Sequence, residues 1–222
     1  NMKNILKNEI LTDLYSRAQN SFESYVSGDQ EAVDTFEYDA WAKFFAITDI
    51  FRADHATAWH NLRLYFNPIT GKFIPIGFDA SLPRFFADPK AKSEISHPSF
   101  LRFFKKRSRN EIILFNDPIF AKKYVQAVTK LASKQHLDSF MLAYDNYFDN
   151  QFKIINSSFP FVRSIDDQLR LSARLLLASV EPPPDPFKFK KFSIKNTLSP
   201  NNMRLAFSSN HFLPIEIISV EN

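Results

Sequence analysis

The side chains best suited to chemistry lie within residues 54–81, in the stretch DHATAWHNLRLYFNPITGKFIPIGFDAS. The polar residues on either side of its two short apolar runs are Asp54, His55, His60, Asn61 and Asp79. An Asp at the end of a helix, then an Asn, then a strand pair leading to a second Asp is an order used in phosphoryl transfer. There, one Asp orients or deprotonates the attacking hydroxyl, and the Asn and the later Asp hold the metal ion on the nucleotide phosphates. Polar residues also end ordinary solvated hairpins, so residue types alone leave both interpretations open.

Other candidate sites in the sequence have weaker support. His97, His136 and His211 are scattered and fit no zinc-ligand spacing. The chain has no Cys, which excludes disulfides and thiolate chemistry. Ser81 lies in no nucleophile motif, so a serine hydrolase has little support. We interpret His60 as a group that supports the metal ligands rather than as a ligand itself.

A basic run, RFFKKRSRN, is the one feature that could bind phosphate or nucleic acid. Its charged members are Arg102, Lys105, Lys106, Arg107 and Arg109. A solvated loop is the favoured interpretation, because Phe103 and Phe104 can anchor such a loop as readily as stack on bases. Nucleic-acid binding therefore ranks third among the functions considered.

The polar stretch lies between elements that hydrophobic periodicity predicts. Apolar residues four apart over 4–26 predict a helix, and AWAKFFAITDIF predicts a second, packed helix that Asp39 caps and that ends near residues 52–54. Apolar and polar residues alternate in NLRLYF, which predicts a strand. The turn signal NPITGK and the return strand FIPIGF follow, and Pro75 makes this second strand short or an edge strand.

Further helices and a change of pattern follow the hairpin. Asp117 before Pro118 predicts a capped helix start. Two more helices are predicted over 137–155 and from Ser164 to about residue 178, the last with a capping pair. The sequence EPPPDP then breaks the chain, and FKFKKFSI, MRLAF and LPIEIISV read as strands.

Composition limits the classes of protein. The chain has 222 residues, of which 45% are hydrophobic and 23% charged, as is typical of a globular protein. Only 3 Gly are present and no glycine-rich phosphate loop is found. A net charge of +4 is weak evidence for an acidic partner. No apolar run approaches ~20 residues, so no membrane span is expected. The chain ends inside a predicted strand, and we expect a piece of a longer protein.

Taken together, these motifs resemble the CotH kinase family, the spore-coat protein H type of atypical kinase. The matching segments are Asp54, His60-Asn61, LRLYF, GKFIPI and GFDAS, while NDPIFAKKYVQAVTKL and NNMRLAFSSNHFLPIEIISV resemble later parts of the family. The resemblance runs from about residue 32 to the C-terminus, and its specific part is the hairpin region.

The resemblance implies an α+β fold. A mainly helical kinase-like lobe with a small β-hairpin sheet would occupy residues 1–180. A C-terminal β segment over 187–222 could begin a further module. The nucleotide-clamping residues of the family lie upstream, and none is identifiable in residues 1–40.

It also implies an ATP-dependent phosphotransferase acting on Ser or Thr of a protein substrate. ATP and Mg²⁺ or Mn²⁺ would be its cofactors, and its location would be secreted or at the cell surface, as for a spore coat. Asp54 takes the catalytic role, Asn61 and Asp79 bind the metal, and His60 supports them. Asp54 and Asn61 are seven residues apart, against five in ordinary protein kinases, which implies a looser loop.

The sequence departs from the family at the metal motif. Where the family reads Trp-Asp-x-Asp after Ile-Pro, this chain reads Ile76-Gly77-Phe78-Asp79, so Gly77 replaces the first carboxylate. A lost carboxylate weakens Mg²⁺ binding. Either Asp79 takes over, or the chain is a catalytically weak or inactive kinase-like scaffold that binds partners on a surface. A third explanation is that Gly77 is needed for a backbone with positive φ.

Overall fold

The structure is a computed structural model that describes residues 8–58, 60–80, 99, 114–160, 165–182, 187–193, 203–211 and 213–214. Its elements are α2 (Glu9–Ser27), α3 (Ala32–Thr35), α4 (Tyr38–Ile50), the 3₁₀ turn η1 (Asp54–Thr57), β1 (Arg63–Asn67), β2 (Lys72–Ile76), α6 (Pro118–Leu131), α7 (Lys134–Ser158), α8 (Ile165–Val180), β3 (Phe187–Ser193) and β4 (Met203–Ser209). The fold is α+β and mainly helical, as the sequence predicts. Within the described residues the strands form two separate antiparallel pairs, β1–β2 and β3–β4.

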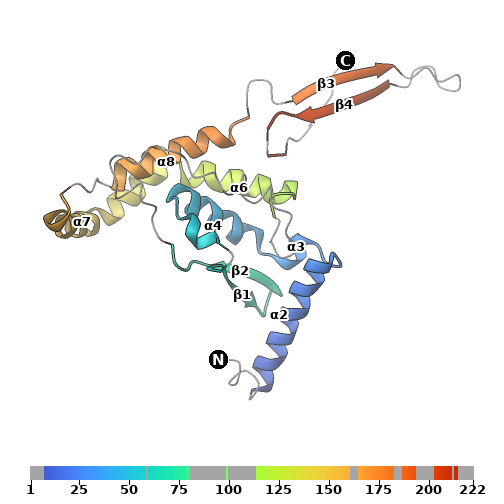
Figure 1. Cartoon of the computed structure of the whole chain (residues 1–222), viewed down its shortest axis with the longest axis horizontal. Helices are drawn as coiled ribbons and strands as arrows, with labels where there is room; N and C mark the ends of the chain where they lie inside the picture. Colours follow the sequence, from blue (N-terminus) through green and yellow to red (C-terminus); the bar gives the residue numbers. More distant parts are fainter. Residues whose placement is uncertain are drawn as a thin grey trace, which may run out of the picture.

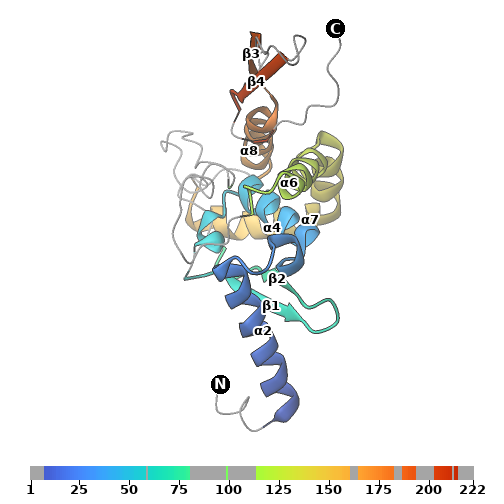
Figure 2. The ribbon, with the colours of Figure 1, turned by 90° about the vertical axis from the view of Figure 1, so that its right-hand side faces the viewer.

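Helix α4 lies at the centre of this arrangement. It packs against α6 and α8 on one side and against the β1–β2 hairpin on the other (Figure 1). Helix α2 and the β3–β4 hairpin lie at opposite ends of the molecule in both views (Figures 1 and 2). The elements that contact the two ends of α4 position the residues of the candidate site.

The start of α4 is fixed by the hairpin and not by a side-chain cap. Glu37 occupies the N-cap position without a capping side-chain hydrogen bond. Its backbone N–H donates to the carbonyl of Phe73 in β2 at 3.0 Å, which satisfies a donor that a cap would otherwise take. The prediction that Asp39 caps this helix is therefore wrong. Asp39 lies in the first turn and pairs with Lys123 of α6 at 2.7 Å.

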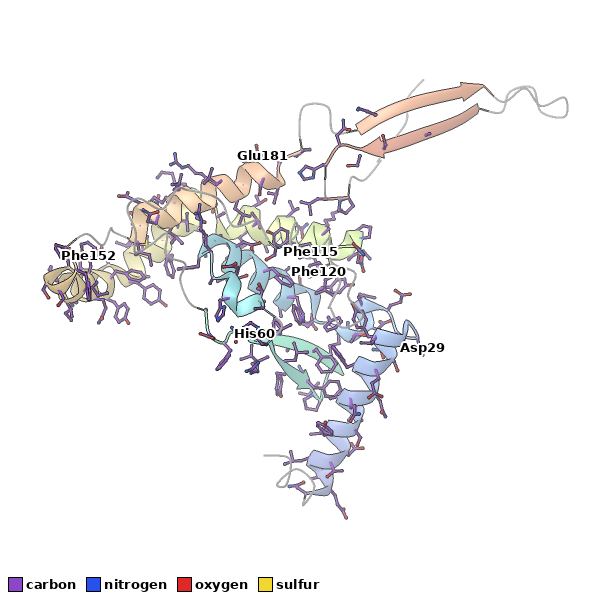
Figure 3. All side chains as sticks on the ribbon, viewed as in Figure 1. Asp29, His60, Phe115, Phe120, Phe152 and Glu181 are labelled. Carbon is purple, nitrogen blue, oxygen red and sulfur yellow. The ribbon has the colours of Figure 1, made fainter. Side chains whose placement is uncertain are left out.

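Aromatic rings fill the core around α4. The buried rings are Phe36, Tyr38, Trp41, Phe45, Phe73, Phe115, Phe120 and Tyr124. Many meet edge to face, such as Phe36 with Trp41 at 5.5 Å between ring centroids and Phe115 with Tyr124 at 5.0 Å. Edge-to-face contact is a favoured geometry for aromatic pairs. Figure 3 shows Phe115 and Phe120 in the layer between α4 and α6. The high Phe content is thus used in the core.

The β1–β2 hairpin forms where period two predicts it. Leu62, Leu64 and Phe66 pack against the core, while Tyr65 is exposed. The strands pair from Arg63 opposite Ile76 to Asn67 opposite Lys72. In a sheet of two strands both strands are edges, which accommodates Pro75 as predicted. The turn between the strands has Gly71 at φ +69, a conformation that glycine adopts readily.

The helices after the hairpin agree largely with the sequence. Asp117 caps α6 by accepting the N–H of Ile119 at 2.8 Å, and its other oxygen accepts the Tyr38 hydroxyl at 2.5 Å. Burial, and then this carboxylate, raise the pKa of Tyr38 well above its usual range. Helix α7 begins three residues earlier and ends three later than predicted, with Ser133 as its cap. The cap at Ser164, the basic run over 102–109 and the strand LPIEIISV from residue 215 lie outside the described residues.

The link between α4 and the hairpin can be tested at Trp41. Its indole Nε1 donates to the Phe73 carbonyl at 2.9 Å in the buried core. We expect Trp41→Phe to lower the free energy of unfolding by about 2–3 kcal/mol, because it removes this bond and leaves a cavity. Urea unfolding measures the change. Ile69→Ala at the exposed hairpin tip, expected to change it by less than about 0.5 kcal/mol, is the control. Equal effects of the two variants would contradict the proposed link.

Candidate functional site

The last turn of α4 is held by buried polar contacts. The Asp49 carboxylate is 8% exposed and accepts the Ser99 N–H, the Ser99 hydroxyl at 2.7 Å and the Tyr124 hydroxyl at 2.6 Å. Arg52 follows at φ +52, and its Nε donates to the Ser172 hydroxyl at 3.2 Å. Burial lowers the pKa of the Arg52 guanidinium from its usual range. These contacts fix the direction in which the chain leaves the helix.

The 3₁₀ turn η1 follows at once and begins with Asp54. The Thr57 hydroxyl donates to the Asp54 carbonyl at 2.8 Å and closes the turn. Asp54 is half-buried, and the next residue, His55, is exposed. The predicted catalytic Asp therefore lies directly beside a histidine that the sequence argument did not select.

Asn61 binds the backbone of that histidine. It is only 6% exposed, and its amide Nδ2 donates to the His55 carbonyl at 3.1 Å. The same carbonyl accepts the N–H of Ala58 at 3.1 Å. Because the amide nitrogen is engaged, the amide oxygen is the Asn61 atom with which a metal ion could bond.

Asp79 reaches the same histidine from the other side of the hairpin. Its Oδ2 lies 3.2 Å from His55 Nε2, and the two side chains are 48% and 44% exposed. Asp79 has φ +48, a left-handed backbone that Asp adopts more readily than most residues. The His60 ring meets the His55 ring at 5.4 Å between centroids, nearly edge to face. In Figure 3, His60 lies close to the hairpin and η1.

Arg63 ties the two sides of the site together. Its Nη1 donates to the His60 carbonyl at 2.8 Å, and its guanidinium lies 4.6 Å from the centroid of the Phe78 ring. Cation–π contact of this kind is worth about 0.5–1 kcal/mol at an exposed position. The residue before Asp79 is thereby held to the start of β1.

Asn61 thus bonds to the backbone carbonyl of His55 and Asp79 contacts the His55 ring. His60 lies against the same ring, and Asp54 directly precedes His55 in the chain. Sequence reasoning named His55 among the polar residues of this stretch but gave it no role. His55 lies in a 3₁₀ turn and His60 lies beyond it, so helical spacing does not predict the contact between their rings. The roles assigned to Asp54, Asn61 and Asp79 remain predictions.

Gly77 is not required by the backbone. Its φ lies outside the positive range in which Gly28 and Gly71 are found, and a Cβ placed on it meets no atom within 4 Å. Positive φ therefore does not explain why the sequence has Gly at this position. A side chain fits there.

An apolar cleft of about 340 Å³ borders the site. Phe44, Ile47 and Phe51 line one wall, and Gly77 and Ala80, which flank Asp79, line the other. This volume lies at the lower end of the range for small-molecule pockets.

The oxygen atoms of Asn61 and Asp79 would form only part of the ligand set of a divalent ion. Within the described part of the chain, no three His, Asp or Glu side chains are close enough to hold a metal ion by themselves. Asp79 and the Asn61 amide supply oxygen ligands, the type that Mg²⁺ and Mn²⁺ prefer. Mg²⁺ is commonly held by one or two carboxylates plus phosphates and water, so this incomplete set agrees with an ion that arrives with a nucleotide.

Comparison of the chain with protein-family models, with curated proteins and with solved structures finds no match. None of the described helices is both long and apolar enough to cross a membrane.

The support that Asn61 gives to His55 can be measured as stability. We expect Asn61→Ala to lower the free energy of unfolding by about 1–2 kcal/mol, because it removes a hydrogen bond made by a buried amide. Asn67→Ala removes a similar bond, to Ile69 N–H, in the exposed hairpin turn and should have an effect below about 0.5–1 kcal/mol. Urea unfolding of both variants tests this. A larger loss for Asn67→Ala would show that Asn61 does not fix the turn.

Proposed function

We propose that this chain is an atypical ATP-dependent phosphotransferase that acts on Ser or Thr of a protein substrate, of the CotH kinase type that its sequence resembles. The observation that carries the proposal is the meeting of Asn61 and Asp79 on His55, directly after Asp54. Residues separated in sequence by a hairpin are thereby collected at one end of the small sheet. The proposal requires that Asp54, the Asn61 amide oxygen and the Asp79 carboxylate all face one bound phosphate group.

Each residue has a distinct role in this proposal. Asp54 orients the attacking hydroxyl and accepts its proton. Asn61, through its amide oxygen, and Asp79, through its carboxylate, hold a divalent ion. Bound ATP with Mg²⁺ or Mn²⁺ supplies the phosphoryl group and neutralises its charge. His60 packs on the His55 ring and helps to keep both ligands in place.

The apolar cleft supports a bound nucleotide. Two of its lining residues, Gly77 and Ala80, lie on either side of Asp79 in the chain, so a ligand in the cleft is adjacent to the proposed metal ligand. The aromatic walls from α4 suit a flat base, because stacking on aromatic rings tolerates any base. We place the nucleotide base in this cleft.

A second function, an inactive kinase-like scaffold at a cell or coat surface, is favoured by one observation. The motif has a single carboxylate, Asp79, and that carboxylate contacts His55. A pair with one negative charge neutralises nucleotide phosphates and metal less well than two carboxylates do. Binding of nucleotide without transfer would favour this second function.

The two roles of the carboxylates can be separated. We expect Asp54→Ala to abolish transfer from ATP to a Ser- and Thr-rich unfolded protein while keeping the rise in melting temperature that Mg²⁺-ATP produces, since bound ligand stabilises the native state. Asp79→Ala should lose that rise as well. Asp39→Ala, a carboxylate paired with Lys123 away from the site, is the control. Transfer at the parent rate by both site variants would refute the phosphotransferase.

Gly77→Asp tests the missing carboxylate. A side chain fits at this position, so we expect little change in melting temperature without ligand. A second carboxylate near the ion should strengthen binding of Mg²⁺-ATP about tenfold, ~1.4 kcal/mol. Isothermal titration calorimetry of the parent chain and of Gly77→Asp with Mg²⁺, with and without ATP, measures the affinity.

Gly71→Asp is the matched comparison for this substitution. Gly71 lies at φ +69, so the same change should destabilise the chain, by about 0.5–1 kcal/mol, without affecting nucleotide affinity. Unchanged affinity in Gly77→Asp would mean that position 77 does not face the ion, and the match of IGFD to the metal motif would then be discarded.

A further inference from the structure

The contact between His55 and Asp79 has the separation expected of two ligands on one metal ion. His55 Nε2 and Asp79 Oδ2 are 3.2 Å apart. Imidazole nitrogen and carboxylate oxygen bind first-row ions at about 2.1 Å, so two such donors 3.2 Å apart subtend roughly 100° at the ion. That angle lies between the octahedral and tetrahedral values. The separation of the two donors therefore suits a shared ion.

The backbone holds both donors at this separation. The His55 carbonyl accepts hydrogen bonds from Asn61 Nδ2 and from the Ala58 N–H, which fixes the residue in η1. Asp79 has a left-handed backbone, φ +48, that costs an L-residue about 1 kcal/mol. The contact with Phe78 and Arg63 fixes the chain just before it.

The two side chains are also open to a ligand. They are 44% and 48% exposed, so an ion and its water or phosphate ligands can reach them. No other side chain in the described residues contacts the Asp79 carboxylate, and the His60 ring lies beside the His55 ring at 5.4 Å.

We propose that His55 takes the place of the carboxylate that Gly77 does not supply, so that His55 and Asp79 together bind a divalent first-row transition ion in preference to Mg²⁺. This rests on the proposed function in one respect, the use of Asp79 as a metal ligand. A neutral imidazole is a good ligand for Mn²⁺, Co²⁺ or Zn²⁺ but a poor one for Mg²⁺, which prefers oxygen. The ring binds through Nε2 as the neutral tautomer that carries its single proton on Nδ1, and the ion then takes the place of the direct contact between Nε2 and Asp79. Water or phosphate completes the coordination.

The test titrates the whole chain with MnCl₂, CoCl₂ and MgCl₂ separately, without nucleotide. Calorimetry gives the affinities, the visible absorption of Co²⁺ reports a bound nitrogen ligand, and Mn²⁺ broadens the histidine ring signals nearest to it in NMR spectra. His55→Gln is the key variant, because an amide can still donate to Asp79 but is not an imidazole ligand. His136→Gln, at an exposed position at the start of α7, is the matched control.

We expect the parent chain to bind Mn²⁺ and Co²⁺ at least about tenfold more tightly than Mg²⁺. His55→Gln should lose about tenfold or more of the Mn²⁺ and Co²⁺ affinity, with the change in the Co²⁺ spectrum, and should keep its Mg²⁺ affinity within about twofold. His136→Gln should behave as the parent. The His55 ring signal should be the first that Mn²⁺ broadens.

Three results would overturn the inference: unchanged Mn²⁺ and Co²⁺ affinity in His55→Gln, an equal loss in His136→Gln, or no preference over Mg²⁺ in the parent chain. Each leaves the phosphotransferase proposal standing, since Mg²⁺ can enter with the nucleotide. Conversely, a His55-dependent metal site in a chain that shows no ATP-induced stabilisation and no transfer would refute the phosphotransferase and leave the metal pair in place.

Discussion

One backbone carbonyl, that of Phe73, joins the two parts of the molecule on which the candidate site depends. It accepts the Trp41 indole N–H at 2.9 Å and the Glu37 backbone N–H at 3.0 Å. A buried carbonyl has two acceptor positions, and both are used here by the first turn of α4. Strand β2 is therefore held at a fixed height along α4, and so is the segment after β2 that carries Asp79. Without this link the hairpin would be an isolated strand pair, which is marginally stable in water.

The opposite end of α4 fixes the other half of the site. The buried Asp49 carboxylate accepts several hydrogen bonds, and Arg52 turns the chain at positive φ against α8. Partly satisfied buried charges are strongly destabilising, so such contacts favour a single arrangement. The start of η1 consequently has little freedom, and His55 is presented to the hairpin from a rigid support. The two ends of one helix thus set the distance between His55 and Asp79.

Local patterns were enough to predict most of the fold. The alternation in NLRLYF gave the β1 face that packs on the core, and Asp117 before Pro118 gave the cap of α6, because both depend on neighbours in sequence. Asp39 was a good cap by residue type, yet α4 starts earlier because a strand distant in sequence supplies the hydrogen bond at Glu37. Tertiary contacts override local preference in this way wherever a helix end is buried against another element.

The candidate site was only partly predictable for the same reason. Asp54, Asn61 and Asp79 could be selected by type and order. The contacts of Asn61 and Asp79 with His55 could not, since they depend on a 3₁₀ turn and on a left-handed backbone at Asp79. No rule of sequence spacing for a 3₁₀ turn or for a left-handed Asp predicts that His55 and Asp79 are in contact. The absence of positive φ at Gly77 matters most for function. Because the backbone does not require glycine there, the proposed site pairs one carboxylate with one imidazole where two carboxylates would suit Mg²⁺. In that proposal the change of ligand chemistry would change the preferred ion.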